Sequence, residues 1–347
     1  MKILAIESSC DDTAAAVVEN GRNVVSSIVS SQINDHKIYG GVVPEVASRK
    51  HIENIAPVVK SALECVNLNL SDIDALAVTF APGLIGSLLV GLNFAKGLSI
   101  ASGLPIVPVH HIKAHIASLY LTNPDLKPPF LCLVVSGGHS HIVEVKSYTE
   151  FNVLGRTRDD AAGEAFDKVG RRLGMDYPGG VMLDKIAEKG DPLSFKLPVP
   201  LSGEDNTYDF SFSGLKTAMI NIINKFNQKN EKLPVEDLSA SFRKSVVDCL
   251  TDNFIRAAKD YNYSVLAIAG GVSANSLLRR QLESECAKRN FKFYKPEMQY
   301  CGDNAAMVSS QGYYEFLNGN RASLNLNARA WELLTQIYNL FISFINL

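Results

Sequence analysis

Closely spaced cysteine pairs are missing from this 347-residue sequence. Its six cysteines are scattered with no Cys-x-x-Cys spacing, at Cys10, Cys65, Cys132, Cys249, Cys286 and Cys301. Zinc ribbons and the disulfide frameworks of small secreted domains need clustered cysteines, so the sequence favours neither. We therefore expect a protein of a reducing compartment, long enough for two domains.

Long apolar runs are also missing. The first run, residues 3–6, ends at Glu7 after four residues and is too short for the core of a signal peptide. No run approaches the length of a transmembrane helix. These absences predict a cytoplasmic protein that does not associate with a membrane.

An excess of positive charge is absent as well, since the formal net charge is -2 and the pI is near 6.4. Any nucleic-acid partner would need a local basic patch. Three arginine pairs could supply one, although each is more typical of a solvated face: Arg156/Arg158, Arg171/Arg172 and Arg279/Arg280.

Among the features present, residues 105–119 stand out with the sequence PIVPVHHIKAHIASL. The β-branched run at 105–109 predicts a buried strand that leads into a helix starting near His110. His111 and His115 would then lie one turn apart on one face and could bind a single ion. The alternative is that one histidine caps the helix and the other packs in the core. Zinc peptidases of the HExxH type need a glutamate where this sequence has Ile112, which disfavours peptidase chemistry.

The order of predicted strands and helices repeats along the chain. Strands are expected at 3–6, 14–18, 23–30, 75–80 and 105–109, and again at 130–135, 141–145, 151–154, 265–269 and 291–295. The simplest explanation is an internal duplication of an α/β unit into two βββαβα lobes around a nucleotide cleft. We expect lobes at 1–125 and 126–330, with a helical insertion at about 156–250.

Small, polar turns follow several of these strands, with the sequences SSCDDT, SGGHS and GGVSANS. Small residues let the backbone approach phosphate and donate N–H groups to it, so three such turns along one crevice would suit a nucleotide. Asp303, in the second half, follows the last strand of its repeat and so occupies a position comparable to that of His111 in the first half. Two imidazoles and a carboxylate with open positions are typical of Fe(II), with zinc as the main alternative.

Eight motifs together resemble the tRNA threonylcarbamoyladenosine transferase family, called TsaD in bacteria. They are ESSCDDT (7–13), YGGVVPEVASRKH (39–51), HHIKAH (110–115), VVSGGHSH (134–141), DDAAGEAFDKVGRRLGMDYPGG (159–180), FSFSGLKTA (210–218), GGVSAN (270–275) and CGDNAAM (301–307). The resemblance covers nearly all of residues 1–331. It implies an actin-like ATPase (ASKHA) fold and a threonylcarbamoyltransferase that acts on N6 of the adenosine 3′ of the anticodon, in tRNAs reading codons that start with adenine.

The resemblance also implies particular site residues. The donor would be threonylcarbamoyl-AMP, and one Fe(II) per subunit would bind His111, His115 and Asp303. Substrate contacts would fall on Val134, Val135, Ser136, Gly137, Gly138, Asp167, Gly180, Asp184 and Asn275. An older family label, O-sialoglycoprotein endopeptidase, conflicts with the missing glutamate.

The catalytic candidates are Asp11, which could orient or deprotonate the acceptor amine, and His139 as the alternate. Asp11 could instead only cap a turn, and His139 could be a hydrogen-bonding turn residue. Asp167 and Asp184 could be solvated carboxylates on helix faces, and Asn275 could only cap the helix that follows it.

Partners are implied by the resemblance as well: a shorter paralogue (TsaB), an ATPase (TsaE) and a separate enzyme that makes the adenylate. The paralogue is expected on the N-terminal lobe, where the apolar face of residues 52–63 could form a helix bundle with it. Residues 331–347 predict an amphipathic extension, for packing on the parent lobe or for self-association. The competing classes are a phosphotransferase of the same superfold and, with no room for its peptide-binding domain, a chaperone-type ATPase.

Overall fold

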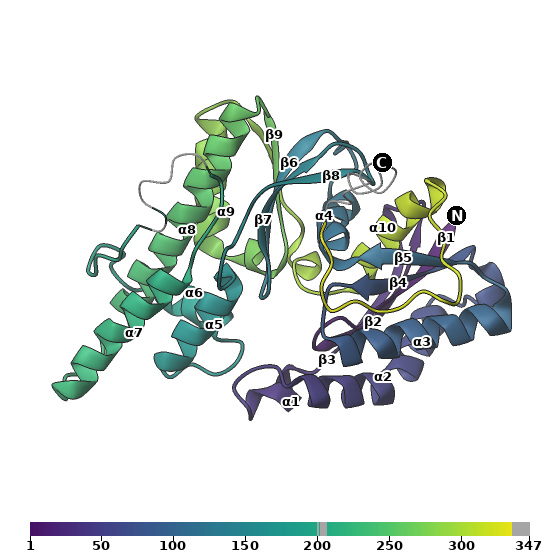
Figure 1. Cartoon of the computed structure of the whole chain (residues 1–347), viewed down its shortest axis with the longest axis horizontal. Coiled ribbons are helices and arrows are strands. Elements are labelled where there is room, and N and C mark those ends of the chain that lie inside the picture. The colour runs from purple at the N-terminus through teal and green to yellow at the C-terminus, as the bar shows by residue number, and fades with distance from the viewer. Residues whose placement is uncertain (200, 202–206, 335–347) are drawn as a thin grey trace, which may run out of the picture.

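The chain folds into two five-stranded mixed sheets of the same design (Figure 1). The computed structural model describes residues 1–199, 201 and 207–334. The first sheet has the order β3-β2-β1-β4-β5, and its strands are β1 (Lys2–Glu7), β2 (Asp12–Glu19), β3 (Asn23–Ser31), β4 (Ala75–Ala81) and β5 (Ile106–His110). The second has the order β10-β9-β6-β7-β8, with β6 (Phe130–Val135), β7 (Ser140–Val145), β8 (Phe151–Arg156), β9 (Val265–Ala269) and β10 (Lys292–Tyr294).

The strand pairings show why the sequence reads as a duplication. In each sheet the first three strands form an antiparallel meander, and the first strand also pairs in parallel with the fourth, so that β1 corresponds to β6 and β4 to β9. Strands β1 and β6 lie at the centre and are buried on both faces, which explains their continuous apolar runs. The predicted α/β fold with two βββαβα units is confirmed.

Helices cover the sheets and fill the insertion. The first unit contains α1 (Ile33–Lys37), α2 (Pro44–Glu64), α3 (Ile85–Ser102) and α4 (His111–Thr122). The second contains α5 (Ala162–Arg172), α6 (Gly179–Ala187), α7 (Ser213–Gln228), α8 (Val235–Asp260), α9 (Ser276–Ala287) and α10 (Ala305–Leu317), with short 3₁₀ turns at Leu70–Asp72, Gly271–Ala274 and Met298–Tyr300. The insertion ends with α8 at Asp260, ten residues beyond the expected boundary at 250.

The last helix of each unit packs on the sheet of the other unit. Ile112, Ile116 and Leu119 of α4 share a buried cluster with Phe130 and Val134 of β6. In the opposite direction, Ala305–Val308 of α10 pack on the first sheet, and α10 also lies against α4 (Figure 1). The packing therefore departs from lobes at 1–125 and 126–330, because α10 and the segment after it lie on the first sheet.

The expected paralogue-binding face of α2 is buried in its own lobe. Ile55, Val58, Val59, Ala62 and Leu63 belong to the core of the first sheet, while Ile52 is 65% exposed. The hypothesis that residues 52–63 offer an apolar face to a partner is therefore wrong for all but Ile52, since an amphipathic helix buries that face on the nearest sheet. Trp331–Leu334 are irregular, and the rest of the expected extension, 335–347, lies outside the described residues.

Helix α3 is a long apolar helix of 18 residues. By length and composition it could cross a membrane, with a mean hydropathy of 1.3 over Ile85–Ser102, so the expectation that no segment approaches this length needs correction. Leu88, Leu92 and Ala95 pack in the first lobe's core, and 28% of the stretch is buried.

Helix α10 lies close to β4 at Gly312, where an added Cβ would lie 2.6 Å from the Cβ of Ala77. We expect Gly312→Ala to lower the free energy of unfolding by about 1–3 kcal/mol through overpacking. Gly97→Ala in α3 is the matched control, because nothing lies within 4 Å of its added Cβ, and it should stabilise the protein by roughly 0.5–1 kcal/mol. Denaturant unfolding compares the two; equal effects would contradict the close approach.

Candidate metal centre and active site

His111 and His115 follow strand β5 and lie where the two lobes meet. His110 is the N-cap of α4, and its Nδ1 accepts a hydrogen bond from the backbone N–H of Ile112 at 3.2 Å. The helix therefore begins at His111, as predicted, and puts His115 one turn further on the same face, with 4.6 Å between the ring centroids. One histidine of HHIKAH does cap the helix, but it is His110 rather than either candidate ligand.

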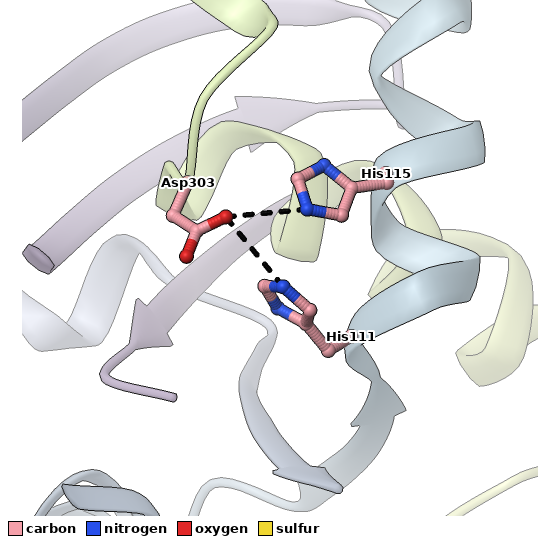
Figure 2. A group of neighbouring side chains, drawn as sticks. All are labelled: His111, His115 and Asp303. Carbon is pink, nitrogen blue, oxygen red and sulfur yellow. Dashed lines mark ion pairs between the residues drawn. The ribbon is translucent and has the colours of Figure 1, made fainter. Parts of the chain in front are cut away.

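The second unit delivers Asp303 to the same point. Asn304 caps α10 by accepting a hydrogen bond from the backbone N–H of Met307, which fixes the turn that carries Asp303. Oδ1 of Asp303 lies 3.5 Å from Nε2 of His111 and 3.2 Å from Nε2 of His115 (Figure 2). The three side chains point toward one another from α4 and from the loop before α10, so the predicted ligand set comes together.

This cluster has the chemistry of a metal site. Its three donor atoms lie within 4.8 Å of one another. His115 is fully buried, and among the described residues its Nδ1 has no hydrogen-bond partner, while its Nε2 faces only Oδ1 of Asp303, at 3.2 Å. A buried imidazole with so few polar partners is costly, and a divalent ion between the three groups would bind its Nε2. The residues present therefore fit a transition metal.

A buried glutamate orients the first ligand. Oε2 of Glu7, at the end of β1, lies 3.1 Å from Nδ1 of His111 and accepts a hydrogen bond from Oγ of Thr79 at 2.7 Å. Its Oε1 accepts from the backbone N–H of Ser9 at 2.6 Å. A carboxylate on the far nitrogen of a metal-bound histidine fixes the ring and raises its basicity. Glu7 was not singled out from the sequence; its one signal there was a carboxylate that ends an apolar strand.

The charges of these groups explain their pKa shifts. Burial alone would lower the pKa of His111, but Asp303 and Glu7 outweigh burial and raise it to about 9. Burial would raise the pKa of Asp303, and the two histidines instead hold it well below its usual range. Burial and then the charge of His111 lower the pKa of His115. Two carboxylates thus hold one positive charge on His111, a charge that a divalent cation can replace.

The glycine turn after β6 lies close to this cluster. The backbone N–H of Ser136 donates to the carbonyl of His139 at 2.7 Å and closes the turn, and an added Cβ at Gly137 or Gly138 would meet nothing within 4 Å. The turn therefore offers open space beside its backbone. Burial, followed by the charge of His111, lowers the pKa of His139 to about 3, which keeps this ring neutral near pH 7.

Asp11 lies at the turn between β1 and β2 and faces the other unit. Its Oδ2 accepts a hydrogen bond from the hydroxyl of Tyr177 at 3.1 Å. Tyr177, which precedes α6, was not predicted as a site residue although its motif was noted. Asp11 thus does more than cap a turn, since it bridges the two halves.

The remaining predicted contacts fall into two groups around the cleft. Val134 and Val135 are buried in β6, so that only their backbone could meet a ligand. Asp167 of α5 accepts from the backbone N–H of Gly180 at 2.7 Å, and burial raises its pKa. Asp167 is therefore a half-buried carboxylate with an internal hydrogen-bond partner, rather than a fully solvated one on a helix face.

Asp184 and Asn275 meet at the start of α9. Oδ1 of Asp184 lies 2.9 Å from Nη1 of Arg243, and its carboxylate also accepts from both the N–H and the hydroxyl of Ser276. Asn275 caps α9 by accepting from the N–H of Leu278 at 3.0 Å, as expected. Arg243 is buried in α8 and was missed, because its carboxylate partner lies 59 residues away in the sequence.

Glu7→Gln should weaken metal binding by about 10- to 100-fold, because the amide removes the charge that orients His111. The affinity is measured by competition with a chelator for Fe(II) or Zn(II), and the metal that stays bound to the protein is then quantified. Glu315→Gln is the matched control, since Glu315 is equally buried in α10 but pairs with Lys113 at 3.5 Å, away from the cluster. Equal affinities for the wild type and Glu7→Gln would rule out this role.

Asp12 gives the fold a pH dependence. Oδ1 is buried with no hydrogen-bond partner among the described residues, and burial, partly offset by a hydrogen bond with Ser31, raises its pKa to about 7. The folded chain then keeps a proton that the unfolded chain releases near pH 4, so this stabilisation is complete below about pH 4 and is lost as the pH rises to 7.

Asp12→Asn stays neutral throughout this range. It should be more stable than the wild type at pH 8 and lose that advantage at pH 4.5, where Asp12 is also neutral in the folded chain. Denaturant unfolding at both pH values, with a chelator present, checks this prediction. A stability difference that does not change with pH would contradict it.

Comparison with curated sequences gives near full-length matches. The chain is 55% identical over 328 residues to a protein of Clostridium botulinum (strain 657 / Type Ba4) named tRNA N6-adenosine threonylcarbamoyltransferase, and the match covers 94% of this chain and 96% of that one. The chain also matches the family TsaD, described as tRNA N6-adenosine threonylcarbamoyltransferase, over residues 23–310.

Solved structures share the fold at low sequence identity. HypF of T. kodakarensis superposes with a TM-score of 0.62 at 14% identity, over 92% of this chain and 48% of that one. Component A of the (R)-2-hydroxyglutaryl-CoA dehydratase of Acidaminococcus fermentans superposes with a TM-score of 0.54 at 14% identity, over 91% of this chain and 98% of that one. These likenesses agree with the actin-like ATPase fold. On the sequence matches, the chain belongs to the tRNA N6-adenosine threonylcarbamoyltransferase family.

Proposed function

We propose that this chain is a tRNA N6-adenosine threonylcarbamoyltransferase that takes the threonylcarbamoyl group from threonylcarbamoyl-AMP. The acceptor is N6 of the adenosine 3′ of the anticodon in tRNAs that read codons starting with adenine. The observation that carries the proposal is the convergence of His111, His115 and Asp303 between the two halves of a chain that belongs to this family. We place the reaction in the cytoplasm.

In this reaction N6 forms a bond to the carbamoyl carbon, and the bond from that carbon to the phosphate oxygen breaks. AMP leaves with the bonding electrons, and N6 gives up one proton. AMP is a good leaving group, whereas the exocyclic amine is a poor nucleophile because its lone pair is delocalised into the ring. The chain must therefore orient the amine, stabilise developing negative charge and accept a proton.

The protein's own groups divide these tasks. The open backbone at Ser136–Gly138 suits donation to the phosphate or the carbonyl oxygen. Asp11 is the better candidate to orient or deprotonate the amine, because His139, with a pKa of about 3, is a weak base. His139 then serves as a hydrogen-bonding group beside the reacting atoms.

His111, His115 and Asp303 would hold the metal, and a bound Fe(II) would supply Lewis-acid polarisation of the donor. Two imidazoles and one carboxylate suit Fe(II) and also admit zinc. The proposed nucleotide contacts are the backbone of Val134 and Val135 together with Asp167, Gly180, Asp184 and Asn275. Asp184 and Asn275 already hold Arg243 and the start of α9, so they would present a rigid edge to the nucleotide.

Partners of the TsaB and TsaE kind complete the proposal. The first lobe exposes Ile38 and Ile52, at 79% and 65%, and these could contribute to a partner contact. A phosphotransferase of the same fold is the competing function, but it would need no imidazole cluster between the lobes.

The decisive assay mixes the chain and its partners with threonylcarbamoyl-AMP and an unmodified tRNA, and detects threonylcarbamoyladenosine by mass spectrometry after digestion. We expect product with the wild type and a loss of at least 100-fold in rate with His111→Ala or His115→Ala, since each removes a ligand of the cluster. His36→Ala is the matched control, because His36 is a buried histidine of α1 that bonds Gln32 rather than the cluster. No product from a folded, metal-loaded wild type would favour the phosphotransferase.

A further inference from the structure

A cavity of about 910 Å³ lies beside the metal cluster and is open to solvent. Its inner wall contains His110, which precedes the ligand His111, and His139, whose ring is close enough to His111, His115 and Asp303 for their charges to shift one another's pKa. The rest of the wall is formed by the end of β8 and by residues 331–334. The cavity is large enough for a nucleoside.

An exposed tryptophan stands at the rim of this cavity. Trp331 is the single tryptophan of the chain, and it is 70% exposed. Within residues 1–199, 201 and 207–334 it has no stacking or cation–π partner. An exposed indole at the mouth of a cavity, with no ring or cation against it among the described residues, offers a flat face for a planar ligand.

Positive charge lies on the opposite rim. Arg156 ends β8 and is exposed, and Arg158, two residues on, is held by Asp209, with Nε 3.0 Å from the carboxylate. This is one of the three arginine pairs, and of the three it is the one that lines this cavity. Below the pair, burial and then the charge of Arg156 lower the pKa of His141 to about 4, so this ring is neutral and can hydrogen-bond without repelling a cation.

A stacking face, a basic rim and a neutral polar interior are the features that bind unpaired nucleotides of RNA. We propose that this cavity receives the adenosine acceptor of the anticodon loop, with Trp331 stacked on a base and Arg156 and Arg158 at the phosphates. The inference rests on the proposed function and adds a location to it. The base would enter from the rim and meet the metal cluster at His139, while the donor occupies the glycine-turn side.

The single tryptophan makes a direct test possible. A chain labelled with 5-fluorotryptophan gives one ¹⁹F resonance, even with unlabelled partner proteins present. The probe is an unmodified anticodon stem–loop RNA, whose binding is measured separately by filter retention. We expect the resonance to shift on binding and to shift much less with the same RNA carrying an abasic nucleotide 3′ of the anticodon. RNA binding without a shift would overturn the proposal.

Variants separate stacking from structure. Trp331→Ala should weaken RNA binding roughly tenfold or more, and Trp331→Phe should recover most of it, because a phenyl ring still stacks. AMP binding should be unchanged in both variants. Leu324→Ala, which trims another exposed apolar residue of the same segment outside the cavity lining, is the matched control and should leave RNA binding unaltered. Loss of AMP affinity rather than RNA affinity in Trp331→Ala would assign the cavity to the donor and overturn the proposal.

The basic rim has its own readout. Arg156→Gln should weaken RNA binding and reduce the slope of log affinity against log salt by about 0.7, as expected for one lost contact to a single-strand phosphate. Lys288→Gln, which removes an exposed charge just after α9 and outside the cavity lining, should leave the slope unchanged. Identical slopes for Arg156→Gln and the wild type would remove Arg156 from the site.

Failure of this inference and failure of the proposed function give different results. In the transfer assay Trp331→Ala should raise KM for tRNA and keep kcat. Product formation by Trp331→Ala with an unchanged KM for tRNA would contradict the cavity assignment without contradicting the transferase function. An RNA-dependent ¹⁹F shift without any product in the transfer assay would support RNA binding at the cavity and contradict the transferase function.

Discussion

The reciprocal packing of α4 and α10 is the constraint on which the site depends. The last helix of each unit of the duplicated fold packs on the sheet of the other unit. The N-terminal ends of α4 and α10 therefore lie close together between the two sheets. His111 begins one of these helices and Asp303 stands just before the other. Ligands far apart in sequence therefore meet without any loop having to reach across the cleft.

Electrostatics then determines what this meeting point can bind. Glu7 is fully buried and Asp303 is half-buried, and two carboxylates so placed are costly unless positive charge lies between them. In the chain itself that charge is a proton on His111. Thr79 and the backbone of Ser9 hold Glu7 in place, so the geometry exists before any cation arrives. Such preorganisation favours a tightly bound ion over a transient one.

The sequence predicted what depends on local pattern and on repetition. The central strands were predicted because they are buried on both faces, and Asp303 was predicted because the duplication gave it a counterpart in His111. The exchange of helices was not predicted, because periodicity shows which face of a helix is apolar but not which sheet it covers. For the same reason the apolar face of α2 was assigned to a partner although the first sheet buries it. Arg243 and Glu7 were missed because a buried charge is recognised through its partner, and theirs lie 59 and 104 residues away.

The helix pair also defines an axis. Any rotation of one half against the other about α4 and α10 produces displacements that grow with distance from them, so the metal ligands are nearly stationary. Away from this helix pair (Figure 1), Lys37 of the first half forms an ion pair with Asp176 of the second at 2.9 Å, and a rotation would separate the two. Such a rotation would open the cleft and leave the three proposed metal ligands nearly in place.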